Sequence, residues 1–440
     1  MRNLKGGYLR KKMERKTEVN FGNLLLSLSE AMDLGGPALA QHQQRTAFAA
    51  WEIAKSAGFS ADIKERICTA ALLHDMGAMS VEEKNALHRS EVEDVDAHCI
   101  RAAILLRRSP LLEHTADVVR FHHREWHDWD ESVDMPHVMA SQIIFLADYL
   151  ERSIKRDQYI LHQHQQVIDD VKSLSGDIIH PRIVDYFLSV SYREEFWMDM
   201  VSPRLYSLLL QQGPYRNIDI GLPAAAAISE LFRDVIDFRS PFTATHSSGV
   251  AAVAEMIARI FGFSEAEVEL LKVAGNLHDI GMFAVPNTIL EKPDKLTEDE
   301  FAIVRCHPYY TYHAIYTIAG LRQIAEWAAY HHEKLDGSGY PFHCKADELS
   351  TGARIMAVAD TFAALAEDRP YRKSMSKEEA QQTIRKLSSG QLLDDRIVNL
   401  LFENYYQVMA YVIARQKAAR TFYDAVFSGI AADGGTTAEQ

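Results

Sequence analysis

The sequence predicts an all-α fold made of two copies of one helical domain. Apolar residues recur at three-to-four spacing in segments such as 47–54 and 250–257, which is the period of an amphipathic helix. Turn signals such as the glycine-rich stretch 336–339 separate the helical segments, and few stretches alternate in the manner of a strand. A pattern of histidines and aspartates also occurs twice along the chain, which indicates a duplicated domain.

The repeated pattern is a set of seven residues in each half. The first two histidines of each half are 32 positions apart, and the next two are 24 apart. An aspartate follows the second histidine, another histidine follows the fourth, and an apolar helical segment then carries a lone aspartate. The matched residues are His42, His74, Asp75, His98, His122, His123 and Asp148 in the first half, and His246, His278, Asp279, His307, His331, His332 and Asp360 in the second. A single histidine in an apolar helix is usually a core residue, but packing does not require ten of nineteen histidines at twice-repeated separations.

Imidazole and carboxylate side chains in these numbers are the ligands of catalytic sites with two metal ions. In the second half, His278 and Asp279 follow the apolar helical run 268–277. Adjacent helix residues point about 100° apart, so this pair can serve two ions from one wall of a pocket. We expect Gly281 to end the helix and to leave the pair at an open mouth.

Composition and charge narrow the class of partner. The formal net charge of −14 argues against a DNA or RNA partner, because nucleic-acid-binding proteins present a basic face. A small anionic substrate stays compatible, since metal ions and a few arginines can invert the local field. The scattered cysteines indicate reduced thiols and neither a disulfide frame nor a zinc ribbon; they are Cys68, Cys99, Cys306 and Cys344.

The hydropathy of the chain bears on its location. No apolar run approaches the ~20 residues that a transmembrane helix needs, and the N-terminus lacks the apolar core of a signal peptide. We therefore expect a cytoplasmic protein without a transmembrane segment. The basic run 10–16 is expected to be a solvated terminus, with contact to membrane phosphates as the alternative.

At 440 residues, the chain is long enough for two domains that each have their own core. The repeat predicts a first domain at residues 19–202, a linker at 203–220 and a second domain at 221–415. We expect residues 416–440 to form the end of a helix and a tail, in which the small and polar residues 431–440 are disordered.

Four motifs in the second half are long and specific. Residues 278–281 read His-Asp-Ile-Gly, and 285–293 read Val-Pro-Asn-Thr-Ile-Leu-Glu-Lys-Pro. Residues 331–341 read His-His-Glu-Lys-Leu-Asp-Gly-Ser-Gly-Tyr-Pro, and 368–372 read Asp-Arg-Pro-Tyr-Arg. On these motifs, the stretch 242–396 resembles the HD-GYP family, a branch of the HD superfamily of metal-dependent phosphohydrolases. The first half resembles a plain HD domain, because it has no Gly-Tyr-Pro loop after its double histidine.

The resemblance implies an all-helical fold, two iron or manganese ions, and hydrolysis of cyclic dinucleotides, either cyclic di-GMP or mixed cyclic GMP-AMP. It implies that the seven residues of the second half are metal ligands, that His278 and Asp279 are central to catalysis, and that Asp279 bridges the ions. It also implies that Tyr340, Arg369 and Arg372 hold the base or phosphate of the substrate. Two arginines three positions apart could both donate hydrogen bonds to one phosphate, although ion pairs with nearby carboxylates are the ordinary alternative.

Two positions depart from the family pattern. Met282 stands where the family usually has a lysine that contacts a substrate phosphate, and Ala78 stands there in the first half. A thioether can neither donate a hydrogen bond nor neutralise charge. We nevertheless place Met282 on the substrate side of the site. Phe242 stands where some members have a glutamate that recruits a third metal, so we expect two ions.

Several functions stay open at this stage. The leading prediction is a cyclic dinucleotide phosphodiesterase, with a linear dinucleotide or a mononucleotide as its product. The alternatives are a non-catalytic cyclic dinucleotide receptor, which the missing lysine would fit, and a nucleotidase-like hydrolase, which the Gly-Tyr-Pro loop argues against. For the first domain, we predict metal binding without hydrolysis of the cyclic dinucleotide, in a role that regulates the catalytic half or holds a homodimer together. The alternatives for this domain are a slow hydrolase of another phosphate ester and an inactive relic of the duplication, whose histidines merely survive in the core.

Overall fold

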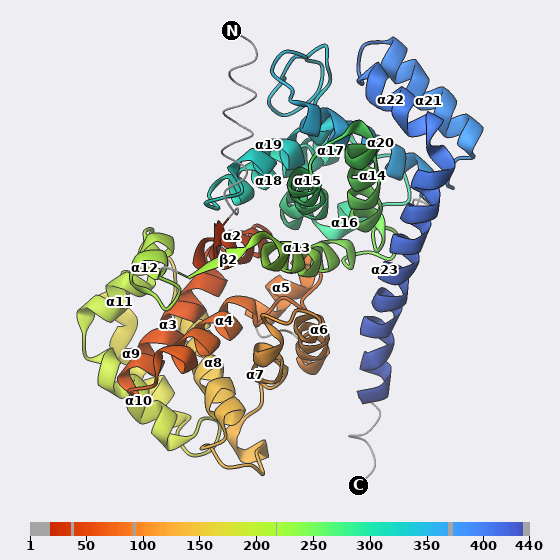
Figure 1. Cartoon of the computed structure of the whole chain (residues 1–440). Helices are drawn as coiled ribbons and strands as arrows, with labels where there is room; N and C mark the ends of the chain where they lie inside the picture. Colours follow the sequence, from red (N-terminus) through yellow and green to blue (C-terminus); the bar gives the residue numbers. More distant parts are fainter. Residues whose placement is uncertain are drawn as a thin grey trace. The chain divides into compact units, whose positions relative to one another are not determined.

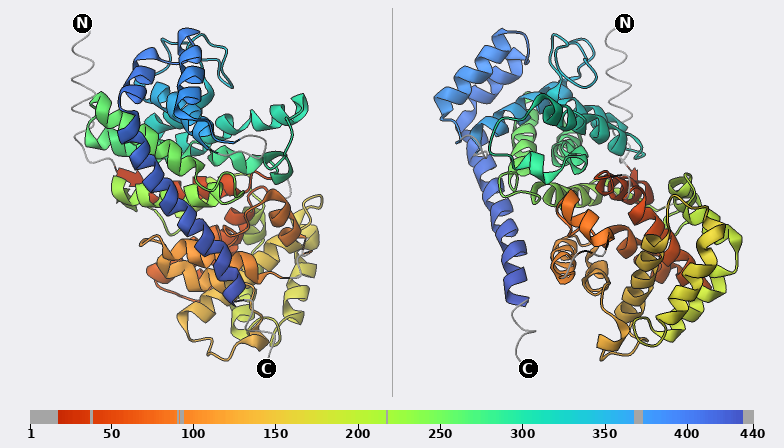
Figure 2. Two further views of the ribbon diagram at one scale, coloured as in Figure 1. Left: turned by 90° about the vertical axis from the view of Figure 1, so that its right-hand side faces the viewer. Right: turned by 180° about the vertical axis from the view of Figure 1, so that it is seen from behind.

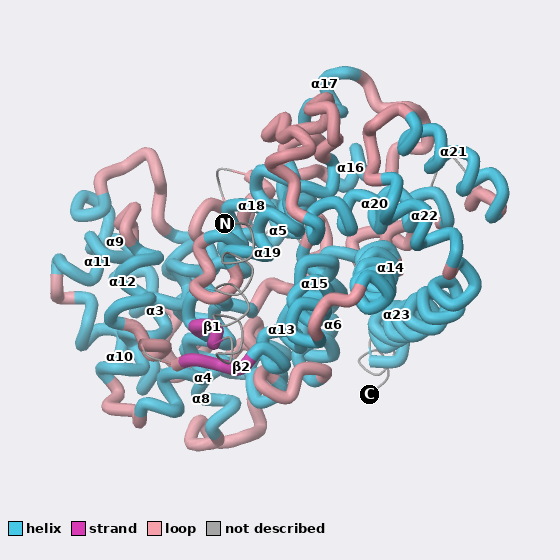
Figure 3. Tube along the Cα trace, turned by 45° about the horizontal axis from the view of Figure 1, so that its top comes forward, coloured by secondary structure: helices cyan, strands magenta, loops and turns pink. Residues whose placement is uncertain are grey.

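The computed structural model describes residues 18–36, 39–89, 91, 94–216, 218–367 and 373–433. Helices make up almost all regular structure of this described part (Figure 1). The exception is a two-stranded antiparallel ribbon of β1 (Glu18–Asn20) and β2 (Asp219–Gly221), with Val19 opposite Ile220 (Figure 3). The predicted all-α class is therefore confirmed.

The described chain divides into two compact units. We call residues 28–218 with 426–433 the N-unit, and residues 18–27 with 219–425 the C-unit. The limits of these units differ from the predicted domain limits, because residues 19–27 lie in the C-unit. There β1 pairs with β2, and the Ser27 hydroxyl hydrogen-bonds the hydroxyl of Thr317.

The N-unit is built around one buried helix. Its elements are the second part of α2 (Phe21–Met32), α3 (His42–Ser56), α4 (Ala61–Leu73), α5 (Val81–His88), α6 (Asp96–Arg107), η1 (Glu113–Thr115), α7 (Ala116–Arg120), η2 (Trp126–Asp128), α8 (Pro136–Ser153), α9 (Ile160–Ser173), α10 (Pro181–Ser191), α11 (Glu194–Met200) and α12 (Leu205–Gln212). Between His42 and Ala54, every α3 residue except Arg45 is buried, and the helix packs against α4, α8 and α10. The predicted linker contains α12, which also packs on α3.

The C-unit repeats this plan. Its elements after β2 are α13 (Leu222–Asp237), α14 (His246–Phe261), α15 (Glu265–Leu277), η3 (Ile280–Ala284), α16 (Asn287–Leu290), α17 (Glu298–Val304), α18 (His307–Tyr316), α19 (Arg322–Ala329), η4 (Tyr330–His332), α20 (Thr351–Ala366), α21 (Lys377–Ser389), α22 (Asp395–Glu403) and α23 (Tyr405–Asp433). The central helix α14 packs against α15 and α20. It therefore has the place that α3 has in the N-unit.

Two predictions concern the ends of the chain. The helix α23 runs without a break in both views of Figure 2 and extends to Asp433, and disorder of the tail stays a prediction. Residues 434–440 and the basic run 10–16 lie outside the described residues. Among the helices that are described, none combines the length and the apolar character needed to span a bilayer.

Candidate metal centre

The structure brings together all seven ligands that were predicted in the C-unit. They come from the ends of helices more often than from their middles. One histidine begins α14 and another begins α18, a His-Asp pair follows α15, a double histidine ends η4, and an aspartate lies within α20. The residues are His246, His278, Asp279, His307, His331, His332 and Asp360.

Asp279 lies between two groups of histidines. Its Oδ2 atom is 3.5 Å from Nε2 of His278 and 3.9 Å from Nε2 of His246. Its Oδ1 atom is 3.3 Å from Nε2 of His307 and 3.8 Å from Nε2 of His331. Each carboxylate oxygen thus faces its own pair of ring nitrogens, which is the arrangement that a carboxylate bridging two ions requires.

Asp360 completes both groups. Its Oδ1 atom is 3.4 Å from Nε2 of His246 and 4.0 Å from Nε2 of His278, while its Oδ2 atom is 3.6 Å from Nδ1 of His332. The donor set of five imidazoles and two carboxylates suits transition metals such as iron and manganese.

The histidines are held in the tautomer that ligands need. The Nδ1 atoms of His278, His307 and His331 each lie 2.6–2.9 Å from the backbone carbonyl three residues earlier. Because Nδ1 donates there, the lone pair of Nε2 points into the cluster. The Nε2 atom of His278 is buried without a hydrogen-bond partner, which costs about 1–3 kcal/mol in the absence of a ligand. The Nε2 atoms of His307 and His331 face each other at 3.0 Å, so a shared cation would relieve two opposed lone pairs. The residues therefore fit a metal ion.

The N-unit holds the same arrangement. The Oδ2 atom of Asp75 is 3.3 Å from Nε2 of His42 and 3.4 Å from Nε2 of His74. Its Oδ1 atom is 3.3 Å from Nε2 of His98 and 3.8 Å from Nε2 of His122. The remaining predicted ligands, Asp148 and His123, border this cluster: Asp148 Oδ1 is 3.6 Å from Nε2 of His42, and the His123 ring centroid is 4.1 Å from that of His122.

Two family models, each describing an HD domain, match residues 39–153 and 230–397. This chain is a tandem HD-domain protein. The resemblance of its two halves to HD-superfamily domains is thereby confirmed, and the N-unit and C-unit contain the N-terminal and C-terminal HD domains.

Named proteins resemble the chain over different lengths. The 3′3′-cGAMP-specific phosphodiesterase 1 of Vibrio cholerae is 29% identical over 415 residues, which cover 91% of this chain and 96% of the relative. The cyclic di-GMP phosphodiesterase response regulator RpfG of Xanthomonas campestris is 36% identical over 183 residues, which are 41% of this chain and 48% of the relative. The crystal structure of the cyclic GMP-AMP-specific phosphodiesterase V-cGAP3 of V. cholerae superposes with a TM-score of 0.61 at 22% identity, covers 88% of this chain and 98% of that one, and supports the fold.

Burial and neighbouring charges set the protonation states of the C-terminal HD domain. Burial by itself raises the pKa of Asp279, but the four surrounding histidines hold this pKa below its ordinary value. The pKa of Asp360 is likewise held well below its ordinary value. Burial lowers the pKa of His307 and His331, and it lowers the pKa of His332 to about 3. At neutral pH the carboxylates are charged and these imidazoles are neutral, as metal binding requires.

A cavity of about 650 Å³ opens beside these ligands. Five of the seven ligands line it, namely His246, Asp279, His307, His332 and Asp360. Met282 and Phe242 lie on its wall, so the two positions that depart from the family pattern both face this space. Lys292 and Lys295 line it as well, although sequence analysis assigned neither of them to the site. Lys292 pairs with Glu300 at 2.6 Å, whereas the exposed Lys295 makes no ion pair with any described residue.

The Gly-Tyr-Pro loop packs beside the double histidine. The Tyr340 ring centroid is 4.9 Å from that of His332, and the guanidinium of Arg305 lies 5.0 Å from the Tyr340 ring. A Cβ atom at Gly339 would overlap the backbone at Glu333, so this glycine is needed for backbone packing. The Glu333 carboxylate accepts hydrogen bonds from three successive backbone N–H groups, at residues 342–344, and thereby anchors the loop. Arg369 and Arg372 lie outside the described residues, and their substrate-binding role stays a prediction.

The prediction that Gly281 ends a helix is wrong. The helix α15 ends at Leu277, and His278 caps it in the right-handed conformation. Gly281 lies within η3, where a Cβ atom would overlap the carbonyl oxygen of His307. The glycine therefore lets the His278–Asp279 corner approach the start of α18, and Gly77 does the same against His98.

Sequence analysis missed two residues that position the first histidine of the C-terminal HD domain. Glu367 Oε2 lies 2.9 Å from Nδ1 of His246 and fixes its tautomer. Asp237 accepts hydrogen bonds from the backbone N–H and the hydroxyl of Ser247, in the first turn of α14, and burial raises its pKa to about 7. Asp33, nine positions before His42 as Asp237 is before His246, accepts from the Gln43 N–H. This doubled spacing is a signal that could have revealed Asp237.

Proposed function

We propose that the C-terminal HD domain is a phosphodiesterase that hydrolyses a cyclic dinucleotide at two metal ions, iron or manganese, held by the seven ligands. The observation that carries this proposal is Asp279, whose two oxygens face separate histidine groups on the wall of the cavity. Two relatives named above are phosphodiesterases of cyclic dinucleotides, which supports the same class of substrate here.

Of the two cyclic dinucleotides, we favour 3′3′-cGAMP. The relative that matches both HD domains carries that substrate in its name. The cyclic di-GMP relative described above matches 41% of the chain. Since the whole-length match includes the N-terminal HD domain, it is the better guide to this chain.

Each part of the site would have a separate task. Paired ions of this kind supply a Lewis acid and a nucleophile at neutral pH. His278 and Asp279 would hold these ions, and Asp279 lines the cavity. Lys295 supplies a positive charge for a substrate phosphate. The apolar wall, which includes the exposed rings of Phe242 and Phe301, offers surface to the bases.

The competing proposal is that the protein binds a cyclic dinucleotide without hydrolysing it, and this proposal rests on Met282. This side chain lines the cavity but cannot contact a phosphate through a charge. Lys295 favours the enzyme, because it lines the same cavity without an ion pair to a described residue and can supply the cation that position 282 lacks.

For the N-terminal HD domain we propose metal binding without hydrolysis of the cyclic dinucleotide. It lacks a Gly-Tyr-Pro loop, and Arg152 pairs with Asp148 Oδ2 at 2.9 Å. In the C-terminal HD domain the matched position is Ala364, which lines the cavity. A role in dimerisation stays a prediction.

Incubation of the purified full-length protein with 3′3′-cGAMP or cyclic di-GMP, in the presence of Mn²⁺ or Fe²⁺, tests the proposal. Chromatography should show a linear dinucleotide or a mononucleotide, formed faster from 3′3′-cGAMP. An Asp279→Asn variant is the control for a contaminating activity. Tight binding without turnover under these conditions would select the receptor instead.

A further inference from the structure

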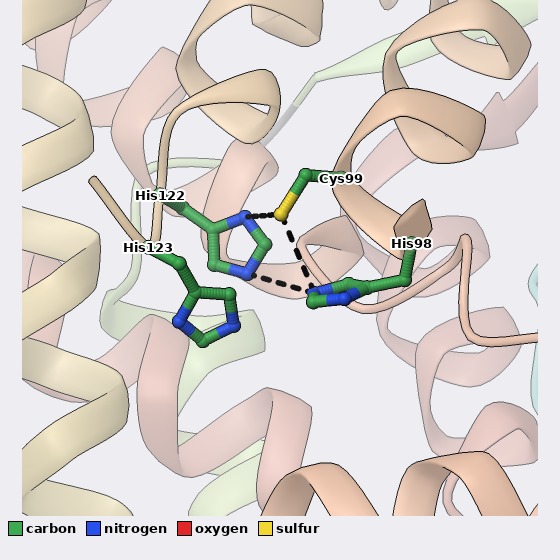
Figure 4. A group of neighbouring side chains, drawn as sticks. All are labelled: His98, Cys99, His122 and His123. Carbon is green, nitrogen blue, oxygen red and sulfur yellow. Dashed lines mark hydrogen bonds between the residues drawn. The ribbon is translucent and has the colours of Figure 1, made fainter. Parts of the chain in front are cut away.

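A cysteine lies among the ligands of the N-terminal HD domain. Figure 4 shows Cys99 between His98 and His122, with His123 beside His122. The Sγ atom of Cys99 is 3.6 Å from Nε2 of His98 and 3.6 Å from Nδ1 of His122, and the two Nε2 atoms are 3.4 Å apart. One donor atom from each of the four residues lies within 4.8 Å of all the others. These are separations that the ligands of one metal ion can have.

The ordinary interpretation of a buried cysteine is a small apolar core residue. Cys99 is fully buried, and its Sγ is 3.3 Å from the backbone carbonyl of Val95, as helical cysteines commonly are. What sets it apart is its polar surroundings, because two imidazoles of the metal cluster contact its sulfur. The Nδ1 atom of His122 also lies 2.6 Å from the Val119 carbonyl, so donation there turns the Nε2 lone pair toward the cluster.

The C-terminal HD domain offers no such donor. Its residue at the matched position, next to His307, is Pro308, which has no side-chain donor atom. The group of His307, His331 and His332 therefore provides nitrogen, with oxygen from Asp279. The candidate ligands of the N-terminal domain thus include a soft sulfur donor, whereas those of the C-terminal domain are nitrogen and oxygen. In mixed sites with histidine, thiolate ligands favour zinc over iron or manganese.

We propose that the N-terminal HD domain binds Zn²⁺ through the Cys99 thiolate together with His98, His122 and His123. Binding removes the thiol proton, which passes to solvent, and forms a sulfur–metal bond. Asp75 Oδ1, at 3.3 Å from Nε2 of His98, is a competing donor outside this set of four. Four protein ligands are the number that closed, structural zinc sites use, whereas catalytic sites keep a position open for water. The thiolate thus gives the domain a metal and at the same time accounts for a lack of hydrolysis there.

The test uses cobalt as a spectroscopic probe in the full-length protein. After removal of bound metal, titration with Co²⁺ should produce the near-ultraviolet charge-transfer band of a thiolate–cobalt bond, and added Zn²⁺ should remove it. The Asp279→Asn variant, whose C-terminal centre is disrupted, should keep the band. Absence of the band in wild-type protein would overturn the proposal without recourse to any cysteine variant.

Two cysteine variants assign the band. Cys99→Ser should abolish it and lower the zinc content by about one ion per chain. Cys306→Ser is the matched control, because Cys306 is also adjacent to a predicted ligand histidine, His307. The protein with this substitution should keep the band. A band that survives Cys99→Ser, or one that disappears with Cys306→Ser, would contradict the assignment.

Discussion

The two HD domains hold matched ligands but surround them differently. Asp75 and Asp279 both lie between two pairs of histidines, at separations that agree within 0.6 Å for each matched pair. Around this common centre, the N-terminal domain has a thiol where the C-terminal domain has a proline, and an arginine where it has an alanine. The candidate ligands lie mainly at helix ends that are fixed by packing, and these divergent residues lie on the same helices, α6 and α8 in the first domain and α18 and α20 in the second. The comparison teaches that one scaffold can keep its arrangement of candidate ligands while the side chains around that arrangement change.

The largest expected effect separates the two matched aspartates, Asp75 and Asp279. Asp279→Asn should lower turnover of the cyclic dinucleotide by more than about 10³-fold, because an amide cannot neutralise two cations in a site that stabilises developing charge. Asp75→Asn should leave this turnover nearly unchanged. Steady-state kinetics on both variants check the prediction, with circular dichroism as the control for folding. Loss of turnover in Asp75→Asn alone would reverse the assignment of catalysis.

A second prediction concerns Gly281, which follows the His278–Asp279 pair. Gly281→Ala places a methyl group against the carbonyl of His307 and should lower the free energy of unfolding by about 2–3 kcal/mol. Gly221→Ala is the control, because its Cβ would meet only Pro223 at 3.7 Å; it should change stability by less than about 0.5 kcal/mol. Urea denaturation measures both values. Equal stability of the two variants would show that η3 does not need its close approach to α18.

The third prediction addresses the cation of the cavity. Lys295→Ala should reduce kcat/KM by about 10–10²-fold, since a charge-assisted hydrogen bond to phosphate contributes about 1.5–3 kcal/mol. The exposed Lys386 on α21 does not line the cavity, so Lys386→Ala serves as the matched control. An unchanged kcat/KM in Lys295→Ala would mean that other groups bind the substrate phosphate.

The fourth prediction compares the carboxylates behind the first histidines. Glu367→Gln should weaken metal binding by about tenfold, because the amide holds the Nδ1 proton of His246 less firmly. Excess metal should restore turnover. Glu151 contacts Nδ1 of His42 at 2.7 Å, so Glu151→Gln should affect only the N-terminal centre. Metal titration followed by activity distinguishes the two, and identical titrations would refute a role for Glu367.

The smallest effect is expected at the departure from the family pattern. Met282 is half-buried on the cavity wall, and lysine has a similar unbranched stem, so Met282→Lys should fold and raise kcat/KM by a few fold, on the order of 1 kcal/mol. Thermal denaturation and kinetics measure the outcome. A large fall in Tm would mean that Met282 is a core residue whose replacement buries a charge.

The sequence predicted the helical class and the candidate ligands because spacing along helices translates directly into position in space. It did not predict contacts between residues far apart in the chain. Glu367 lies 121 positions from His246, and its role in orienting that histidine depends on the packing of α20 against α14. Cys99 was interpreted as an ordinary reduced thiol, because a cysteine next to one histidine has no zinc-ribbon spacing; only the fold brings His122 to it. Gly281 was misinterpreted because helix termination and close backbone approach both select glycine.

The pairing of β1 with β2 makes the C-unit discontinuous along the chain, and this has a consequence during synthesis. Residues 18–27 emerge from the ribosome about 200 residues before their partner strand, a delay of roughly 10–40 s at ordinary elongation rates. Throughout that interval the apolar stretch 24–26, which is fully buried in the finished protein, has no completed unit to enter. Residues 426–433 leave the ribosome late and yet belong to the N-unit. Neither unit can therefore be completed before most of the chain has been made.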